Sequence, residues 1–144
     1  MTPTLRGRWQ TRILLMGTIG SLITLPFALG LVAEASDRYW IILGMVTGLG
    51  VLVWDPWYNF LQTWRWDRDW PALFQLMAGI WEGFFVYVPM RWLLAQANIN
   101  WLDNLDLGVF AVHYGLVWLG VFTSSQTLMR IIFPRWRFRG GQWL

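Results

Sequence analysis

The sequence predicts an all-α integral membrane protein in which four transmembrane helices form one bundle, with both termini in the cytoplasm (N-in/C-in). Hydrophobic residues make up 56% of the 144 residues and charged residues only 13%, which lies outside the ordinary range of soluble domains. Four apolar segments each reach the roughly 20 residues that a helix needs to cross the hydrocarbon core. The length leaves no room for a separate soluble domain, so we expect residues 1–144 to form a single domain.

The four expected spans cover about residues 13–33, 39–61, 71–94 and 105–132. Arginine supplies all 11 basic charges, because lysine is absent. Nine of these 11 arginines precede the first span, lie between the second and third, or follow the fourth, so the positive-inside rule places those segments in the cytoplasm. Most of the 13 tryptophans lie near span ends, which is typical of interface anchoring. We expect the bacterial inner (plasma) membrane, with a thylakoid or other internal membrane as the alternative.

The first span, about residues 13–33, has a competing interpretation as a cleaved signal peptide. It follows a basic leader and ends in Ala33-Glu34-Ala35, which resembles a signal-peptidase site. Its apolar run of about 21 residues exceeds the usual 7 to 15 of a signal sequence, so we expect a retained helix. Gly17 and Ser21 form a small-residue pair suited to helix packing.

The second span, about residues 39–61, contains the GxxxG pair Gly44 and Gly48 and ends near Asp55-Pro56. Asp55 could cap a short interfacial helix that begins at Pro56, or Pro56 could kink a continuous helix whose Asp55 faces the bundle interior. We favour capping, and we expect Asp69 to begin the third span in the same way. The connection carries alternating charges that could form an ion-paired surface and dock a partner: Arg65, Asp67, Arg68 and Asp69.

The third span, about residues 71–94, places Glu82 near the middle of the membrane, where a lone carboxylate is costly. A rise of about 1.5 Å per residue puts Thr24 at the same level and no basic residue there. We therefore expect Glu82 to be protonated and hydrogen-bonded, to contact another subunit, or to carry protons. Asp55, Gln75 and Gln126 complete the candidate intramembrane polar site, in a layer nearer the cytoplasm.

The fourth span, about residues 105–132, contains the only histidine, His113. The same depth count groups His113 with Arg91 and Glu34 near the outer boundary, where we expect a hydrogen-bonded interface residue. An axial ligand to haem or chlorophyll is the alternative. One histidine is too few ligands for a metal site, and we predict neither a metal nor a cofactor.

A basic, aromatic tail follows the fourth span at residues 133–144. Arg135, Arg137 and Arg139 alternate with aromatic residues, which indicates anchoring at anionic lipid headgroups. Docking to a cytoplasmic partner is the functional alternative.

No sequence motif for catalysis accompanies these features, since nucleophile elbows, phosphate-binding glycine loops and HExxH are absent and the chain has no cysteine. The arginines lie beside apolar spans, so we expect no nucleic-acid binding. We predict a non-catalytic accessory or assembly subunit of a larger membrane complex. A small proton-coupled or ion-conducting protein that uses Glu82 is the alternative, and a pigment binder is the third possibility. The expected partners are membrane lipids and either other membrane subunits or further copies of this chain.

Overall fold

The computed structural model describes residues 2–144, whose regular structure is entirely helical. Four helical segments are long and apolar enough to cross a membrane: Leu5–Ala28, Arg38–Thr63, Ala72–Gln96 and Leu107–Ile132. The prediction of an all-α chain with four apolar helices is confirmed. The first segment starts at Leu5 rather than near residue 13, because the Thr4 side chain accepts a hydrogen bond from the Gly7 amide and so caps the helix.

Three of the four segments are pairs of α-helices joined through a π-helical turn. The turns are Met16–Gly20, Gly50–Trp54 and Val86–Met90. A π-helical turn inserts an extra residue and so rotates the helix face that follows it. The helices are α1 (Leu5–Leu15), α2 (Ser21–Ala28), α3 (Arg38–Leu49), α4 (Asp55–Thr63), α5 (Ala72–Phe85), α6 (Arg91–Gln96), α7 (Leu107–Gln126) and α8 (Leu128–Ile132), followed by a 3₁₀ turn, Trp136–Arg139.

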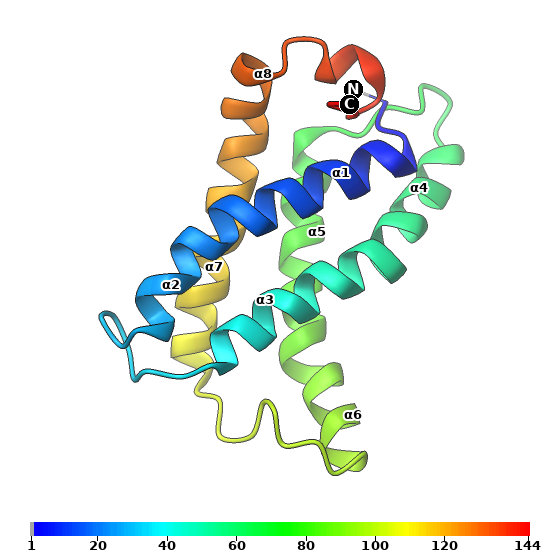
Figure 1. Cartoon of the computed structure of the whole chain (residues 1–144). Helices are drawn as coiled ribbons and strands as arrows, with labels where there is room; N and C mark the ends of the chain where they lie inside the picture. Colours follow the sequence, from blue (N-terminus) through cyan, green and yellow to red (C-terminus); the bar gives the residue numbers. More distant parts are fainter. Residues whose placement is uncertain (1) are drawn as a thin grey trace.

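The first segment lies between the second and the fourth. Helix α2 packs on α3 and α7, while α1 packs on α4 and α7. The first two segments run alongside each other and cross obliquely over α5 and α7 (Figure 1). Both ends of the described chain lie at the same end of the bundle as α8 (Figure 1).

The expected short interfacial helix after Pro56 is wrong, because the second segment is continuous through this point. Trp54 has helical dihedral angles (φ −73°, ψ −45°), and no side-chain cap bond precedes α4. Pro56 directly follows the π-helical turn Gly50–Trp54 and lies inside this continuous segment, where a proline removes one backbone hydrogen bond of the helix. Asp69 does not cap the third segment either, since α5 follows Pro71 without a side-chain cap bond.

The apolar core fills the bundle toward the 97–106 connection. It includes residues from all four segments and two from that connection: Met16, Ile42, Leu43, Val46, Val86, Leu102, Leu105, Phe110, Tyr114 and Val117. A smaller cluster at the opposite end consists of Leu15, Met129 and Trp136. The larger core therefore packs one end of the bundle with mainly apolar side chains.

The tail folds back onto α1, a contact that the sequence did not predict. The Thr4 amide donates to the Gly140 carbonyl (2.7 Å), and the Thr11 hydroxyl donates to the Gly141 carbonyl (3.0 Å). The Trp136 indole N–H donates to the Thr11 hydroxyl (2.9 Å). Gly7 makes this approach possible, because a Cβ at this position would lie 2.0 Å from the Gly140 oxygen.

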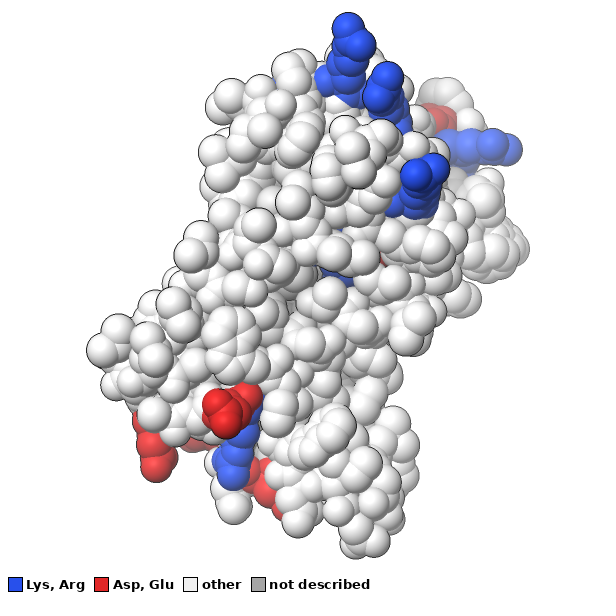
Figure 2. Space-filling view, viewed as in Figure 1, with Lys and Arg blue, Asp and Glu red and all other residues white. Residues whose placement is uncertain are grey.

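Charged side chains gather at the two ends of the face shown in Figure 2, and the broad band between them is largely uncharged. Basic residues cover the end that carries the termini, whereas acidic residues predominate at the other end (Figure 2). Large apolar side chains are exposed along the spans, among them Leu22, Leu52, Ile80 and Leu119. This surface matches what a lipid environment requires of an embedded helix bundle.

Candidate functional site

One arginine joins two carboxylates from different helices inside the bundle. Arg12 on α1 donates through Nε and Nη2 to Asp55 on α4, at 3.0 and 2.9 Å. Its Nη1 and Nη2 donate to Glu82 on α5, at 2.8 and 3.0 Å. Asp55 and Glu82 are only 3% and 5% exposed, so one guanidinium holds two carboxylates largely out of contact with solvent.

Local backbone features bring these three groups together. The π-helical turn Gly50–Trp54 directly precedes Asp55 and so sets the direction of the α4 face that carries it. Gly50 leaves space for the arginine, since a Cβ there would lie 2.4 Å from the Arg12 Cζ and Nη1 atoms. The bundle interior thus accommodates a long side chain that crosses from α1 past the Gly50–Trp54 turn to α5.

The expectation that no basic residue reaches the level of Glu82 is wrong. The expected first span started at about residue 13, but α1 begins at Leu5, so Arg12 lies seven residues inside the helix. At about 1.5 Å per residue this is roughly 10 Å along the helix axis, to which the length of the side chain adds. Thr24, expected at the level of Glu82, bonds His113.

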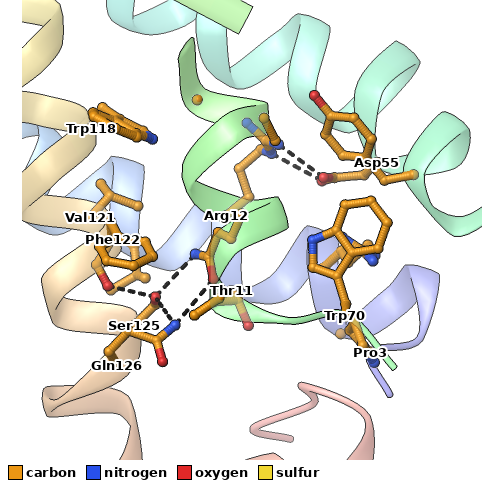
Figure 3. A pocket seen from close by; sticks show the side chains of 18 of the residues that line it. Pro3, Thr11, Arg12, Asp55, Trp70, Trp118, Val121, Phe122, Ser125 and Gln126 are labelled. Carbon is orange, nitrogen blue, oxygen red and sulfur yellow. Dashed lines mark hydrogen bonds and ion pairs between the residues drawn. The ribbon is translucent and has the colours of Figure 1, made fainter. Parts of the chain in front are cut away.

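The arginine bridge forms part of the wall of a cavity of about 310 Å³ between α1, α4, α5 and α7. The cavity extends from Glu82 and Tyr114 to Trp136 and Arg137 of the tail. Figure 3 shows Arg12, Asp55 and Trp70 across the cavity from Trp118, Val121 and Phe122. One wall is thus charged and polar, and the facing wall is mainly apolar.

A chain of amides and a hydroxyl lies along α5 and α7 in the same cavity. The Gln75 side-chain amide donates to the Ser125 hydroxyl at 3.0 Å, and the Gln126 side-chain amide donates to Gln75 Oε1 at 3.2 Å (Figure 3). Arg130 donates in turn to Gln126. The structure therefore brings four of the five predicted intramembrane site residues, Asp55, Gln75, Glu82 and Gln126, to one cavity; Thr24 is not among its lining residues.

Two further donors in the wall lack a well-formed hydrogen bond among residues 2–144. The Tyr58 hydroxyl is buried and interacts only weakly with Glu82, both of whose carboxylate oxygens already accept from Arg12. The Nε atom of Arg8 is also buried without a partner, while its Nη2 donates to Gln62 at 2.9 Å. The Arg8 guanidinium lies 4.5 Å above the ring of Trp70, which fixes its plane.

His113 lies away from this cavity, in a closed aromatic environment. Its ring is 1% exposed, lies 5.0 Å from Phe27 and 5.1 Å from Tyr39, and bonds the Thr24 hydroxyl at 3.0 Å through Nε2. Neither described cavity includes His113, so the geometry lends no support to an axial haem or chlorophyll ligand.

The expected outer cluster of His113, Arg91 and Glu34 does not assemble as one group. Arg91 donates to the Tyr87 hydroxyl and the Leu105 carbonyl, at 3.3 and 3.4 Å. Glu34 reaches the histidine only indirectly, since its carbonyl accepts from Tyr39 at 3.3 Å. A depth count gives only the level of a residue along its helix and not the direction of its side chain, so residues at one level need not meet.

The predicted ion-paired surface in the 64–71 connection forms in part. Arg65 donates through Nε and Nη2 to both carboxylate oxygens of Asp67, at 3.1 and 3.0 Å. These bonds, together with one from the Asp69 amide, hold the pKa of Asp67 below its usual value, so the pair persists in mildly acidic solution. Arg68 adopts a positive φ of 48° and its carbonyl accepts from Gln62, which ties the connection back to α4.

Sequence reasoning missed Arg12, Gly50, Tyr58 and Arg8. Thr4 carried a usable signal, because threonine is a favoured helix N-cap and would have started the first helix at Leu5. Within residues 2–144, no group of three histidine, cysteine or acidic side chains could hold a metal ion. Comparisons of the chain with protein-family models, with curated proteins and with solved structures found no match.

Proposed function

We propose that this chain is a multi-pass membrane protein with both termini and the 64–71 connection in the cytoplasm, in a bacterial inner membrane. Four apolar helices of sufficient length support insertion. Orientation is supported by the arginines, nine of which belong to the end that carries the termini and that connection.

Single-cysteine labelling tests this topology cleanly, because the chain has no cysteine of its own. We expect Asn100→Cys, in the 97–106 connection, to react with a membrane-impermeant thiol reagent added to intact cells. Trp66→Cys, at a side chain that is 95% exposed in the opposite connection, should react only after the membrane is permeabilised. The reverse pattern would overturn the proposed orientation.

The function that the geometry supports best is the binding of a small molecule inside the bundle. The observation that carries it is the cavity of about 310 Å³ whose wall contains the Arg12 bridge. A bundle built only for stability would gain more from filling this space with apolar side chains, because buried ion pairs contribute little stability and voids forfeit packing contacts. Convergent polar groups in an otherwise apolar cavity are typical of ligand sites.

The Arg12 bridge argues against two other roles of Glu82, a contact to another subunit and a proton or ion path. Both Glu82 oxygens accept from Arg12, so this carboxylate needs no basic group from another subunit. Beyond the cavity, the bundle is filled by apolar residues such as Ile42, Val46, Val86 and Val117. These contacts favour a site reached from one side over a continuous proton or ion path.

Native mass spectrometry of the protein extracted from its own membrane tests the binding function. We expect wild-type protein to retain a bound small molecule and Ala78→Phe to lose it, because Ala78 lines the cavity and a phenyl ring would occupy it. Ala111→Phe, on an exposed position of α7, is the matched control and should retain the molecule. Equal spectra for all three proteins would contradict a ligand in this cavity.

A second candidate function, as an accessory or assembly subunit, is favoured by the glycine pair on α3. A Cβ at Gly44 or Gly48 would meet nothing within 4 Å, whereas one at Gly79 or Gly83 would collide with α7. Gly44 and Gly48 therefore make no close helix contact within the chain, and their surface is free to pack against a helix of another subunit.

Blue-native electrophoresis of the membrane extract tests this second function. Replacing Gly44 and Gly48 together by leucine should release the chain from a larger complex. Gly115→Leu, at another glycine with nothing within 4 Å, should leave its migration unchanged. A wild-type chain that migrates alone would remove this candidate.

A further inference from the structure

The arginines of the cavity outnumber its acids and are less fully paired. The lining contains four arginines (Arg8, Arg12, Arg130 and Arg137) and three acids (Asp55, Asp69 and Glu82). Arg12 alone occupies all four carboxylate oxygens of Asp55 and Glu82, and Asp69 is itself engaged. Among the described residues, Arg8, Arg130 and Arg137 form no salt bridge; Arg8 interacts with the charges of Asp55 and Glu82 at longer range, and the other two are exposed.

Two donors of the lining, on α1 and α4, are not fully satisfied. The Arg8 Nε atom is buried without a hydrogen-bond partner, and the hydroxyl of Tyr58, a residue that is 7% exposed, interacts only weakly with Glu82. A buried donor without an acceptor is unfavourable, so a ligand that brings acceptors gains the free energy of satisfying it. A group with several charged acceptor oxygens meets this requirement best.

The rest of the lining suits a short apolar segment. Trp118, Val121 and Phe122 of α7 and Met16 of the first segment cover the wall that faces the charged residues. The volume is at the small end for ligand cavities, so it accommodates a headgroup and a short stretch of hydrocarbon rather than a whole lipid.

From these contacts we infer that the cavity binds a phosphate-type anionic group, held by Arg8, Tyr58 and the arginines toward the tail, with attached hydrocarbon against the α7 wall. This inference rests on the proposed binding function and adds the class of ligand. The same phosphate chemistry occurs in anionic lipids and in free phosphate. A lipid would also gain binding free energy from its hydrocarbon against the α7 wall, whereas free phosphate would not.

Calorimetric titration of the full chain in nanodiscs of zwitterionic lipid tests the ligand class. The probes are dihexanoyl phosphatidic acid, inorganic phosphate and the cationic amphiphile dodecyltrimethylammonium. Binding of the phosphatidic acid alone identifies an amphiphile, and comparable binding of phosphate identifies the free anion. Either result supports the inference, whereas preference for the cationic amphiphile overturns it.

Variants locate the anion. Arg8→Gln should weaken phosphatidic acid binding about tenfold or more, because a charged donor is lost. Arg6→Gln, at an exposed arginine of the same helix, should change the affinity less than twofold. Tyr58→Phe removes a hydroxyl that interacts only weakly with Glu82, so it should fold about as well as wild type and bind several-fold more weakly. Unchanged affinity in both Arg8→Gln and Tyr58→Phe would overturn the proposed location.

The two proposals fail in different ways. If Ala78→Phe loses a native ligand but the anionic probes do not bind, the cavity is a binding site and the anionic class is wrong. If neither the probes nor any native ligand distinguishes Ala78→Phe from wild type, the binding function itself is wrong.

Discussion

At the scale of single residues, Arg12 resolves a problem that each of its partners would face alone. A carboxylate or guanidinium without a partner in the hydrocarbon region costs several kcal/mol. Four hydrogen bonds between Arg12 and the two carboxylates offset that cost for all three groups. Removing one member should therefore destabilise the protein more than replacing all three by neutral residues, because it leaves buried charges unpaired.

Arg12→Gln should lower the free energy of unfolding by about 3–5 kcal/mol, because two buried carboxylates lose their cation. Thermal unfolding in detergent measures the change, and Arg6→Gln, at an exposed position on the same helix, should have little effect. Adding Asp55→Asn and Glu82→Gln to Arg12→Gln should restore much of the lost stability. A triple variant that is less stable than Arg12→Gln would contradict this account of the bridge.

Gly50 supplies a matched comparison with Gly48 on the same segment. A Cβ at Gly50 would lie 2.4 Å from the Arg12 guanidinium, whereas one at Gly48 would meet nothing within 4 Å. We expect Gly50→Ala to destabilise the protein by about 1–3 kcal/mol through displacement of the bridge, and Gly48→Ala to be neutral. Equal unfolding temperatures of the two variants would show that the Arg12 side chain can move away from the added methyl group and still form the bridge.

Glu82 and Asp55 could be selected from the sequence because acidic residues in apolar spans are rare. Their partner could not, since Arg12 resembles the other arginines that flank a span until the start of the helix is known. Tyr58 and Gly50 gave no signal of their own, because their roles depend on which neighbour approaches them in space.

At the scale of elements, α5 and α7 approach closely through small residues on α5. A Cβ at Gly79 would lie 1.5 Å from Trp118 Nε1, and one at Gly83 would lie 2.4 Å from Tyr114 Cε1. The Tyr114 hydroxyl also donates to the Gly79 carbonyl. These glycines therefore set the spacing of two walls of the cavity.

Gly79→Ala should lower the free energy of unfolding by about 1–3 kcal/mol, because Trp118 must leave its position against α5. Gly44→Ala, at an α3 glycine with an open surrounding, should be neutral or slightly stabilising. Differential scanning fluorimetry of the two variants compares them directly. A larger loss for Gly44→Ala would mean that α3, not α5, carries the tighter packing.

At the scale of the whole molecule, the C-terminal tail packs against the start of the first helical segment and so holds the two ends of the described chain together. Its 3₁₀ turn and the residues after it bond Thr4, Gln10 and Thr11 of the first segment. Composition and apolar runs predicted the four helices, since each element could be recognised by itself. The crossing arrangement and the docked tail depend on pairings between distant residues, such as Gly7 with Gly140, that no single segment encodes.

Gly7→Ala should detach the tail from α1, because the added Cβ would lie 2.0 Å from the Gly140 oxygen. We expect faster tryptic cleavage after Arg135, Arg137 and Arg139 in this variant than in wild type. Gly17→Ala, whose Cβ meets nothing within 4 Å, should be cleaved at the wild-type rate. Equal rates for Gly7→Ala and wild type would indicate that the tail detaches readily without any substitution.

The Arg12 bridge also imposes an order on biosynthesis. Arg12, Asp55 and Glu82 belong to the first, second and third spans, so they leave the ribosome one after another. In the proposed membrane topology, the Arg12 side chain can reach headgroup water until its partners follow, by extending toward the surface. Asp55 of the second span can then neutralise it, and Glu82 of the third joins an existing ion pair. Closure of the complete bridge therefore requires the first three spans.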